Sequence, residues 1–189
     1  MKLTERLGKE WVFFDGGMGT ILQAHGLKAG ELPETWNLSH PDEIIALNRS
    51  YFEAGCDVVN TNTFGANALK YPDNLREIVE AAVSHAKTAR SLAGREEAFV
   101  ALDIGPPGKL LQPMGDLPFE RAVELFSETI RIGAAAGADL VLIETMSDSY
   151  EAKAAVLAAK ESCDLPVVVT TIFDEKGKLL TGGTVDSVV

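Results

Sequence analysis

The sequence predicts an α/β protein with a parallel sheet, of the (β/α)8 TIM-barrel type, with about the first five βα units present. Short apolar runs alternate with helical patterns, and the first four runs start near residues 11, 57, 98 and 139. Each interval therefore holds one strand and one helix, the signature of βα repeats. A polar or acidic residue stands at the end of every run: Asp15, Asn62, Asp103, Glu144 and Thr171. Polar groups at every strand end favour a barrel mouth over an open sheet, which gathers them at one switch point.

The elements are expected in the following order. A lead-in helix over 4–9 precedes the first strand, which is buried and covers 11–15. A short helix over 20–24 and a loop over 26–37 come next, and Ser39 caps a helix that runs to about Ala54. The later strands are expected at 57–64, 98–104, 139–145 and 166–173, with helices at 73–93, 118–136, 148–161 and, just starting, 184–189.

Glycines mark where three of these helices end. Gly55, Gly94 and Gly137 each end a helical pattern, and at Gly55 and Gly137 we expect a left-handed helix stop. An acid, Asp57 or Asp139, stands two residues after the first and third of them, just before a buried strand.

Composition narrows the class of protein. The 189 residues fit a single domain, 1–189, and the net charge of −11 argues against a nucleic-acid or membrane surface. The two cysteines form no disulfide framework or metal motif, which fits a reducing cytoplasm. No apolar run approaches the length needed to span a membrane.

The most distinctive loop follows the first strand, Asp15-Gly16-Gly17-Met18-Gly19. Glycines here let backbone N–H groups approach a carboxylate or phosphate, or they only make a tight turn. The spacing matches neither the dinucleotide fingerprint nor the P-loop. Both interpretations stay open on the glycines alone.

Three other strand ends carry polar side chains in apolar surroundings. Alternation would put Asn60, Asn62 and Phe64 on one side of their strand, where buried amides need partners. Glu144 ends an apolar run and needs a cation or hydrogen-bond donor, either from a ligand or from the protein. Asp103 precedes Gly105-Pro106-Pro107-Gly108, so we expect it to stabilise that turn.

No metal site is evident from the residue spacing. None of the three histidines has a second ligand three or four positions away. Cys56 and Cys163 both precede strands, at the end of the sheet opposite the mouth.

Taken together, these motifs resemble the homocysteine S-methyltransferase family, and most closely the homocysteine-binding barrel of its cobalamin-dependent members. The resemblance covers the whole chain. It rests on the segments 14–20, 31–38, 54–67, 103–106 and 143–148.

The resemblance implies a complete (β/α)8 barrel and methyl transfer from methylated cobalamin to homocysteine, which yields methionine. It implies a zinc ion, held by three cysteines after the sixth and eighth strands, that activates the thiol. Further modules would supply cobalamin and methyltetrahydrofolate. The backbone of Asp15, Gly16, Gly17 and Met18 and the carboxylate of Glu144 would fix the amino-acid part of homocysteine, and Asn62 would line the same mouth.

The sequence departs from the family after the fifth strand. We expect a truncated barrel without the zinc cysteines, no homocysteine activation by this chain alone, and association through unpaired edge strands with itself or the missing part. Betaine or S-methylmethionine is the alternative methyl donor. A non-catalytic amino-acid-binding module and an unrelated phosphate-binding α/β protein are the alternatives from other classes.

Overall fold

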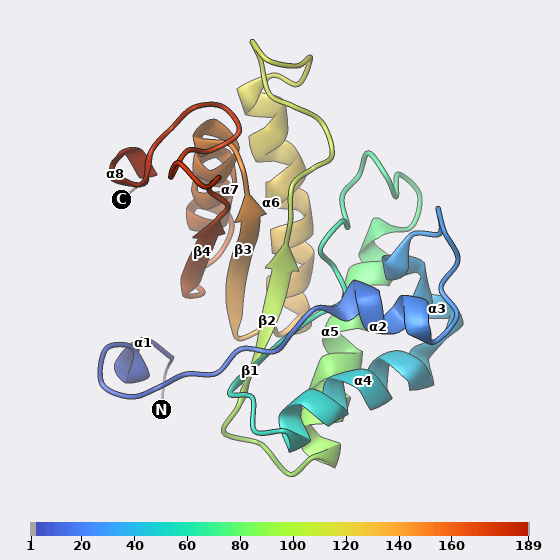
Figure 1. Ribbon diagram of the computed structural model, residues 1–189. Helices are drawn as coiled ribbons and strands as arrows, with labels where there is room; N and C mark the ends of the chain where they lie inside the picture. The colour runs from blue at the N-terminus through green and yellow to red at the C-terminus, as the bar shows by residue number, and fades with distance from the viewer. Residues whose placement is uncertain (1–2, 189) are drawn as a thin grey trace.

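The chain folds as a parallel α/β protein in a computed structural model that describes residues 3–188 (Figure 1). Four parallel strands form one sheet in the same order as in the sequence. They are β1 (Val58–Asn60), β2 (Phe99–Ile104), β3 (Leu140–Met146) and β4 (Val167–Thr171). The predicted class and the parallel sheet are confirmed.

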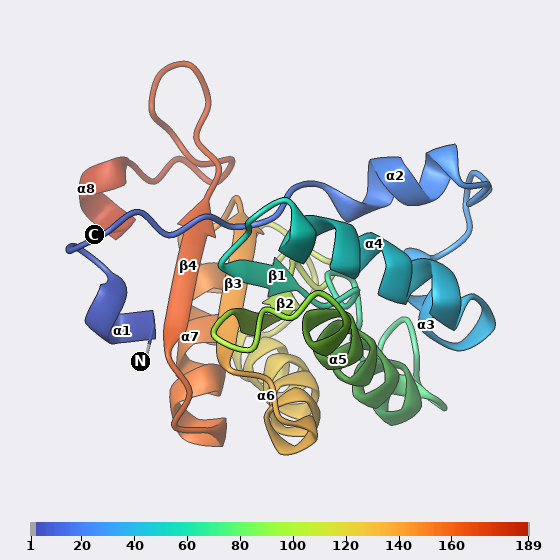
Figure 2. The ribbon, with the colours of Figure 1, turned by 90° about the horizontal axis from the view of Figure 1, so that it is seen from below.

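Helices cover one face of this sheet, and Figure 2 shows them as an arc around the strands. The long ones are α4 (Pro41–Glu53), α5 (Leu75–Leu92), α6 (Phe119–Ala136) and α7 (Ser149–Ser162). The short helical elements are α1 (Leu3–Arg6), α2 (Met18–Ala24), the 3-10 helix η1 (Pro33–Thr35), α3 (Trp36–Ser39) and α8 (Val185–Val188). Within residues 3–188, no helix is both long and apolar enough to cross a bilayer.

Alternate strand residues face two different apolar clusters. Leu102, Val141 and Ile143 pack with the helices on the outer face. On the opposite face, which we call the inner face, Leu3 of α1 packs against strand residues Val58, Ala101, Leu140 and Leu142. At the carboxyl ends of the strands, the inner face carries polar residues in place of these apolar ones.

The glycine stops are confirmed. Gly55, Gly94 and Gly137 have φ values of 102°, 66° and 92°, in the region that only glycine adopts without strain. The acids that follow two of them tie neighbouring segments together. Asp57 accepts a hydrogen bond from the backbone N–H of Phe13 at 2.9 Å, and Asp139 accepts one from Val100 at 2.8 Å.

The expected first strand is wrong as a buried strand. Segment 11–15 makes a single bridge, Phe14 with Val58, and Trp11 and Phe13 are 86% and 60% exposed. In the described part of the chain this segment pairs on one side only, through this bridge to β1. β4 likewise pairs with β3 alone within residues 3–188, and the association through such edges stays a prediction.

Three further expectations are corrected. β1 ends at Asn60 because the backbone N–H of Thr63 turns back to the carbonyl of Thr61 at 2.8 Å. The expected loop over 26–37 contains η1 and the start of α3. Ser39 does not cap α4, because its hydroxyl donates back to the carbonyl of Thr35 at 3.2 Å. Val189, in the last expected helix, lies outside the described residues.

Candidate functional site

The strands end in a group of carboxyl and amide side chains that we call the acid cluster: Asp15, Asn60, Asp103 and Glu144. Register explains why these residues meet. Asn60 lies opposite Ala101, and Asp103 lies opposite Leu142. Asn60, Asp103 and Glu144 each stand two residues after an inner-face residue, so they continue that face towards the strand ends.

Asp15 belongs to the cluster through β1. Its Oδ2 accepts a hydrogen bond from the backbone N–H of Asn60 at 2.8 Å. Its Oδ1 is buried without a partner. Burial, opposed by the Asn60 hydrogen bond and helped by the nearby Glu144 carboxylate, raises the pKa of Asp15 to about 7.

The glycines after Asp15 form an open turn into α2. Gly17 is the N-cap residue of α2, with φ of −64°, and no side chain caps that helix. Neither Gly16 nor Gly17 has a positive φ. At Gly16 a Cβ atom would lie 3.1 Å from the hydroxyl of Tyr51, so the close approach of this ring favours glycine there.

Asp103 and Glu144 form a coupled pair. Asp103 is buried, its Oδ1 has no partner, and a hydrogen bond links its carboxyl to that of Glu144. Burial raises the pKa of Asp103 well above its usual range, and Glu144, Asp15 and Glu34 raise it further. Burial also raises the pKa of Glu144. Two neighbouring carboxyl groups in a buried site favour uptake of a proton.

The expected role of Asp103 is therefore corrected. No backbone N–H of the turn 105–108 donates to its carboxyl in the described structure. The turn is held instead by the backbone N–H of Gly105, which donates to Phe64 at 2.9 Å. The side chain of Asp103 therefore interacts with the acid cluster and not with this turn.

Asn62 is buried beside the cluster, but its amide is engaged. Its Nδ2 donates to the carbonyl of Pro33 at 2.8 Å and to Oδ1 of Asn37 at 3.2 Å. The Nδ2 of Asn37 donates in return to the carbonyl of Asn62 at 2.8 Å. Asn62 thus anchors the segment 33–37 at the rim. The expected sharing of one side by Asn60, Asn62 and Phe64 does not hold, because the strand ends at Asn60.

Glu34 anchors the same segment from a buried position that the sequence did not single out. Its Oε1 accepts a hydrogen bond from the backbone N–H of Gly65 at 2.6 Å, and its Oε2 accepts one from the hydroxyl of Tyr71 at 2.7 Å. An acid next to a proline in a loop gave no signal that it would be buried.

β3 reaches the cluster through a bulge. Ile143 pairs with Val169 and Met146 with Thr171, so Glu144 and Thr145 lie opposite Thr170 alone. Thr145 has φ of 63°, the one non-glycine residue of the described chain with a positive φ. No spacing in the sequence indicates this bulge.

The residues do not fit a zinc site. In the part of the chain that the structure describes, no three His, Cys, Asp or Glu side chains are placed to hold a metal ion. Cys56 lies just before β1, with its Sγ near the carbonyl of Phe14, and Cys163 ends α7. Both stand at the end of the sheet opposite the acid cluster, as expected.

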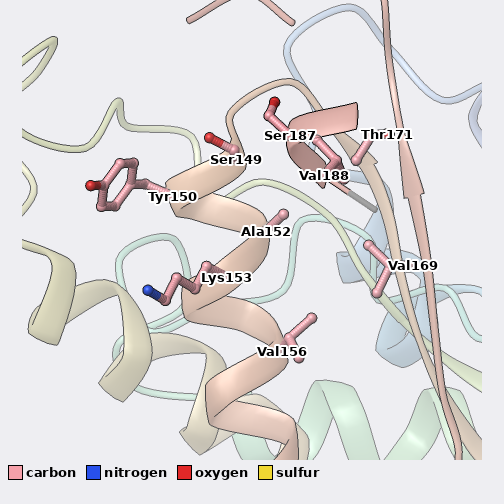
Figure 3. Close-up of a pocket in the computed structure, with 9 residues that line it drawn as sticks. All are labelled: Ser149, Tyr150, Ala152, Lys153, Val156, Val169, Thr171, Ser187 and Val188. Carbon is pink, nitrogen blue, oxygen red and sulfur yellow. The ribbon is translucent and has the colours of Figure 1, made fainter. Parts of the chain in front are cut away.

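A separate groove lies on the outer face. It has a volume of about 630 Å³ and lies between α7, β4 and α8. Figure 3 shows Val169 and Thr171 of β4 facing α7 across it. None of the acid-cluster residues lines this groove.

Comparison with known proteins gives consistent results. The family model described as "Homocysteine S-methyltransferase" matches residues 12–189. The chain is 30% identical over 200 residues to a methionine synthase of Mycobacterium leprae (strain TN), and 28% to that of Mycobacterium tuberculosis (strain ATCC 25618 / H37Rv). Each match covers 97% of this chain and 17% of the relative, so the chain spans about a sixth of their length.

Solved structures show the same fold. The oxidized form of the homocysteine methyltransferase MmuM from Escherichia coli superposes with a TM-score of 0.87 at 20% identity, over 99% of this chain and 71% of that one. Its metallated form gives a TM-score of 0.83, over 95% and 69%.

Proposed function

The chain belongs to the homocysteine S-methyltransferase family, and we propose that its acid cluster binds the amino-acid part of homocysteine. One observation carries this proposal. Three buried acceptor oxygens, Oδ1 of Asp15, Asn60 and Asp103, have no partner in the described structure. Such groups are costly unless a ligand supplies donors.

The chemistry of an α-amino acid suits this arrangement. An ammonium group has three donors and one positive charge. It would satisfy the unpartnered oxygens of Asp15 and Asp103 and interact with the Glu144 carboxylate. The backbone N–H groups of Gly16, Gly17 and Met18 would receive the ligand's carboxylate, because the open turn leaves them near Asp15. Asn62 would act by holding the segment 33–37 at the rim.

The reaction that we propose for the longer protein is methyl transfer to the homocysteine thiolate. The resemblance of the motifs favours methylated cobalamin as donor, with cobalamin and methyltetrahydrofolate carried by other modules. The relatives are methionine synthases, which supports this choice over betaine or S-methylmethionine. No step is assigned to zinc, since the described residues offer no site for it.

Isothermal titration calorimetry tests the binding proposal. We expect the chain to bind homocysteine. Asp103→Asn and Glu144→Gln should each weaken binding by about tenfold or more, because each removes a charge-assisted hydrogen bond. Glu77→Gln, at an exposed position on α5, is the matched control and should bind like the unmodified chain. Equal affinity in all four proteins would refute the proposed site.

A further inference from the structure

The bulge at the end of β3 changes which face its residues occupy. In a regular strand, Leu142, Glu144 and Met146 would all lie on one face. Leu142 packs on the inner face, whereas Met146 is fully buried in the outer cluster with Val141 and Ile143. The extra residue therefore lets β3 direct Glu144 inwards and still bury Met146 against the helices.

The backbone of the bulge must be stabilised by neighbouring contacts. The left-handed conformation of Thr145 costs free energy for a β-branched residue, so surrounding contacts must hold it. The backbone N–H of Thr145 donates to Oγ1 of Thr170 at 3.1 Å. The ladder resumes directly afterwards, where the backbone N–H of Ile172 donates to the carbonyl of Met146 at 2.9 Å.

Thr170 is placed to give this support from the inner face. Val169 and Thr171 face α7 across the outer groove (Figure 3). Strand alternation directs Thr170 to the opposite face, the face that Glu144 also occupies. The Thr170 hydroxyl thus takes the place of the main-chain acceptor that a bulged residue loses.

We propose that Thr170 is a positioning residue, which closes the Glu144–Thr145 bulge and thereby aims the Glu144 carboxyl at Asp103. Its effect on ligand affinity rests on the proposed function. Its effect on the Asp103–Glu144 pair in the free protein does not. The carboxyl groups that interact with Glu144 from the neighbouring elements are those of Asp15 and Asp103, so an outward movement of Glu144 changes how these two groups titrate.

Two variants remove the hydroxyl of Thr170. Thr170→Val keeps the side-chain volume nearly constant, whereas Thr170→Ala also removes the β-branch. Thr170→Ser restores the acceptor, and Thr171→Val is the control on the other face. The readouts are ¹³C NMR pH titration of the carboxyl groups in the free protein, homocysteine affinity by calorimetry, and the melting temperature.

In Thr170→Val and Thr170→Ala we expect the titration midpoints of Asp103 and Glu144 to fall, because Glu144 moves into water and away from Asp103. We expect homocysteine affinity to fall about three- to tenfold, the range for one hydrogen bond. Thr170→Ser and Thr171→Val should stay within about twofold of the unmodified chain.

A lower melting temperature with unchanged titration midpoints in both hydroxyl-free variants would overturn the proposal, since it would show a purely structural role. If the unmodified chain does not bind homocysteine, the proposed function fails. The titration midpoints then still decide the role of Thr170.

Discussion

Glu151 gives the sharpest test of the electrostatics of this fold. It lies in the first turn of α7, is 4% exposed, and accepts no hydrogen bond in the described structure. Burial and, to a smaller extent, the neighbouring Asp148 carboxylate together raise the pKa of Glu151 from 4.5 to about 7. We expect Glu151→Gln to stabilise the protein most above neutral pH and progressively less as the pH falls towards about 4.5.

The magnitude and the sign follow from the direction of this rise. The folded chain holds the proton of Glu151 at a pH where the unfolded chain has lost it. The folded protein therefore bears no penalty below about pH 4.5, and its stability falls as the pH rises to about 7. A rise of this size corresponds to about 3 kcal/mol. The neutral glutamine avoids this loss.

Urea denaturation at pH 5, 6, 7 and 8 measures the difference. We expect the free energy of unfolding of Glu151→Gln to exceed that of the unmodified chain by about 3 kcal/mol at pH 8 and by less than about 1 kcal/mol at pH 5. Glu161→Gln, at an exposed position of the same helix, should show no such trend. A difference for Glu151→Gln that is the same at every pH would refute the reasoning.

Four further substitutions test the packing and the backbone by thermal or urea denaturation. Thr145→Gly should raise the free energy of unfolding by about 0.5–1 kcal/mol, because relief of the left-handed conformation outweighs the added chain entropy of glycine; a loss of stability would contradict this. Gly133→Ala should cost about 1–3 kcal/mol, because the new Cβ would overlap the side chain of Leu102, whereas Gly19→Ala, with nothing within 4 Å, should be neutral or stabilising. Equal effects of the two glycine substitutions would rule out steric overlap as the cause. Asn37→Ala should cost about 2–4 kcal/mol, because it leaves buried groups of Asn62 unpaired, and a cost below about 1 kcal/mol would show that water replaces the amide.

The expected helices and strands are mostly present, and the errors share one cause. The helix limits over 73–93, 118–136 and 148–161 differ from α5, α6 and α7 by two residues or fewer, since long amphipathic patterns and glycine stops are local signals. The segments 11–15 and 57–64 were predicted too long or too buried. Their extent depends on which neighbouring strand is available to pair, and a local pattern does not contain that information.

For the candidate site too, the sequence predicts some features and misses others. Polar residues at strand ends are visible in the sequence, which predicts Asp15, Asn62 and Glu144 as site residues. Their partners were not visible. Asp103 was assigned to a turn, and Asn62 was placed in the mouth, where the structure shows its amide holding the segment 33–37. The role of Glu34 depends on contacts with Gly65 and Tyr71, more than thirty residues away.

The sequence by itself determined the α/β class, the order of the units and the family, because each depends on short patterns repeated along the chain. Only the tertiary structure decided which polar groups meet. Strand register brings Asp103 to Glu144, and a bulge that no residue pattern announces sets the direction of Glu144. Register and bulges arise from pairing between segments 25 to 41 residues apart, so the arrangement of the polar groups exists only when the sheet has formed.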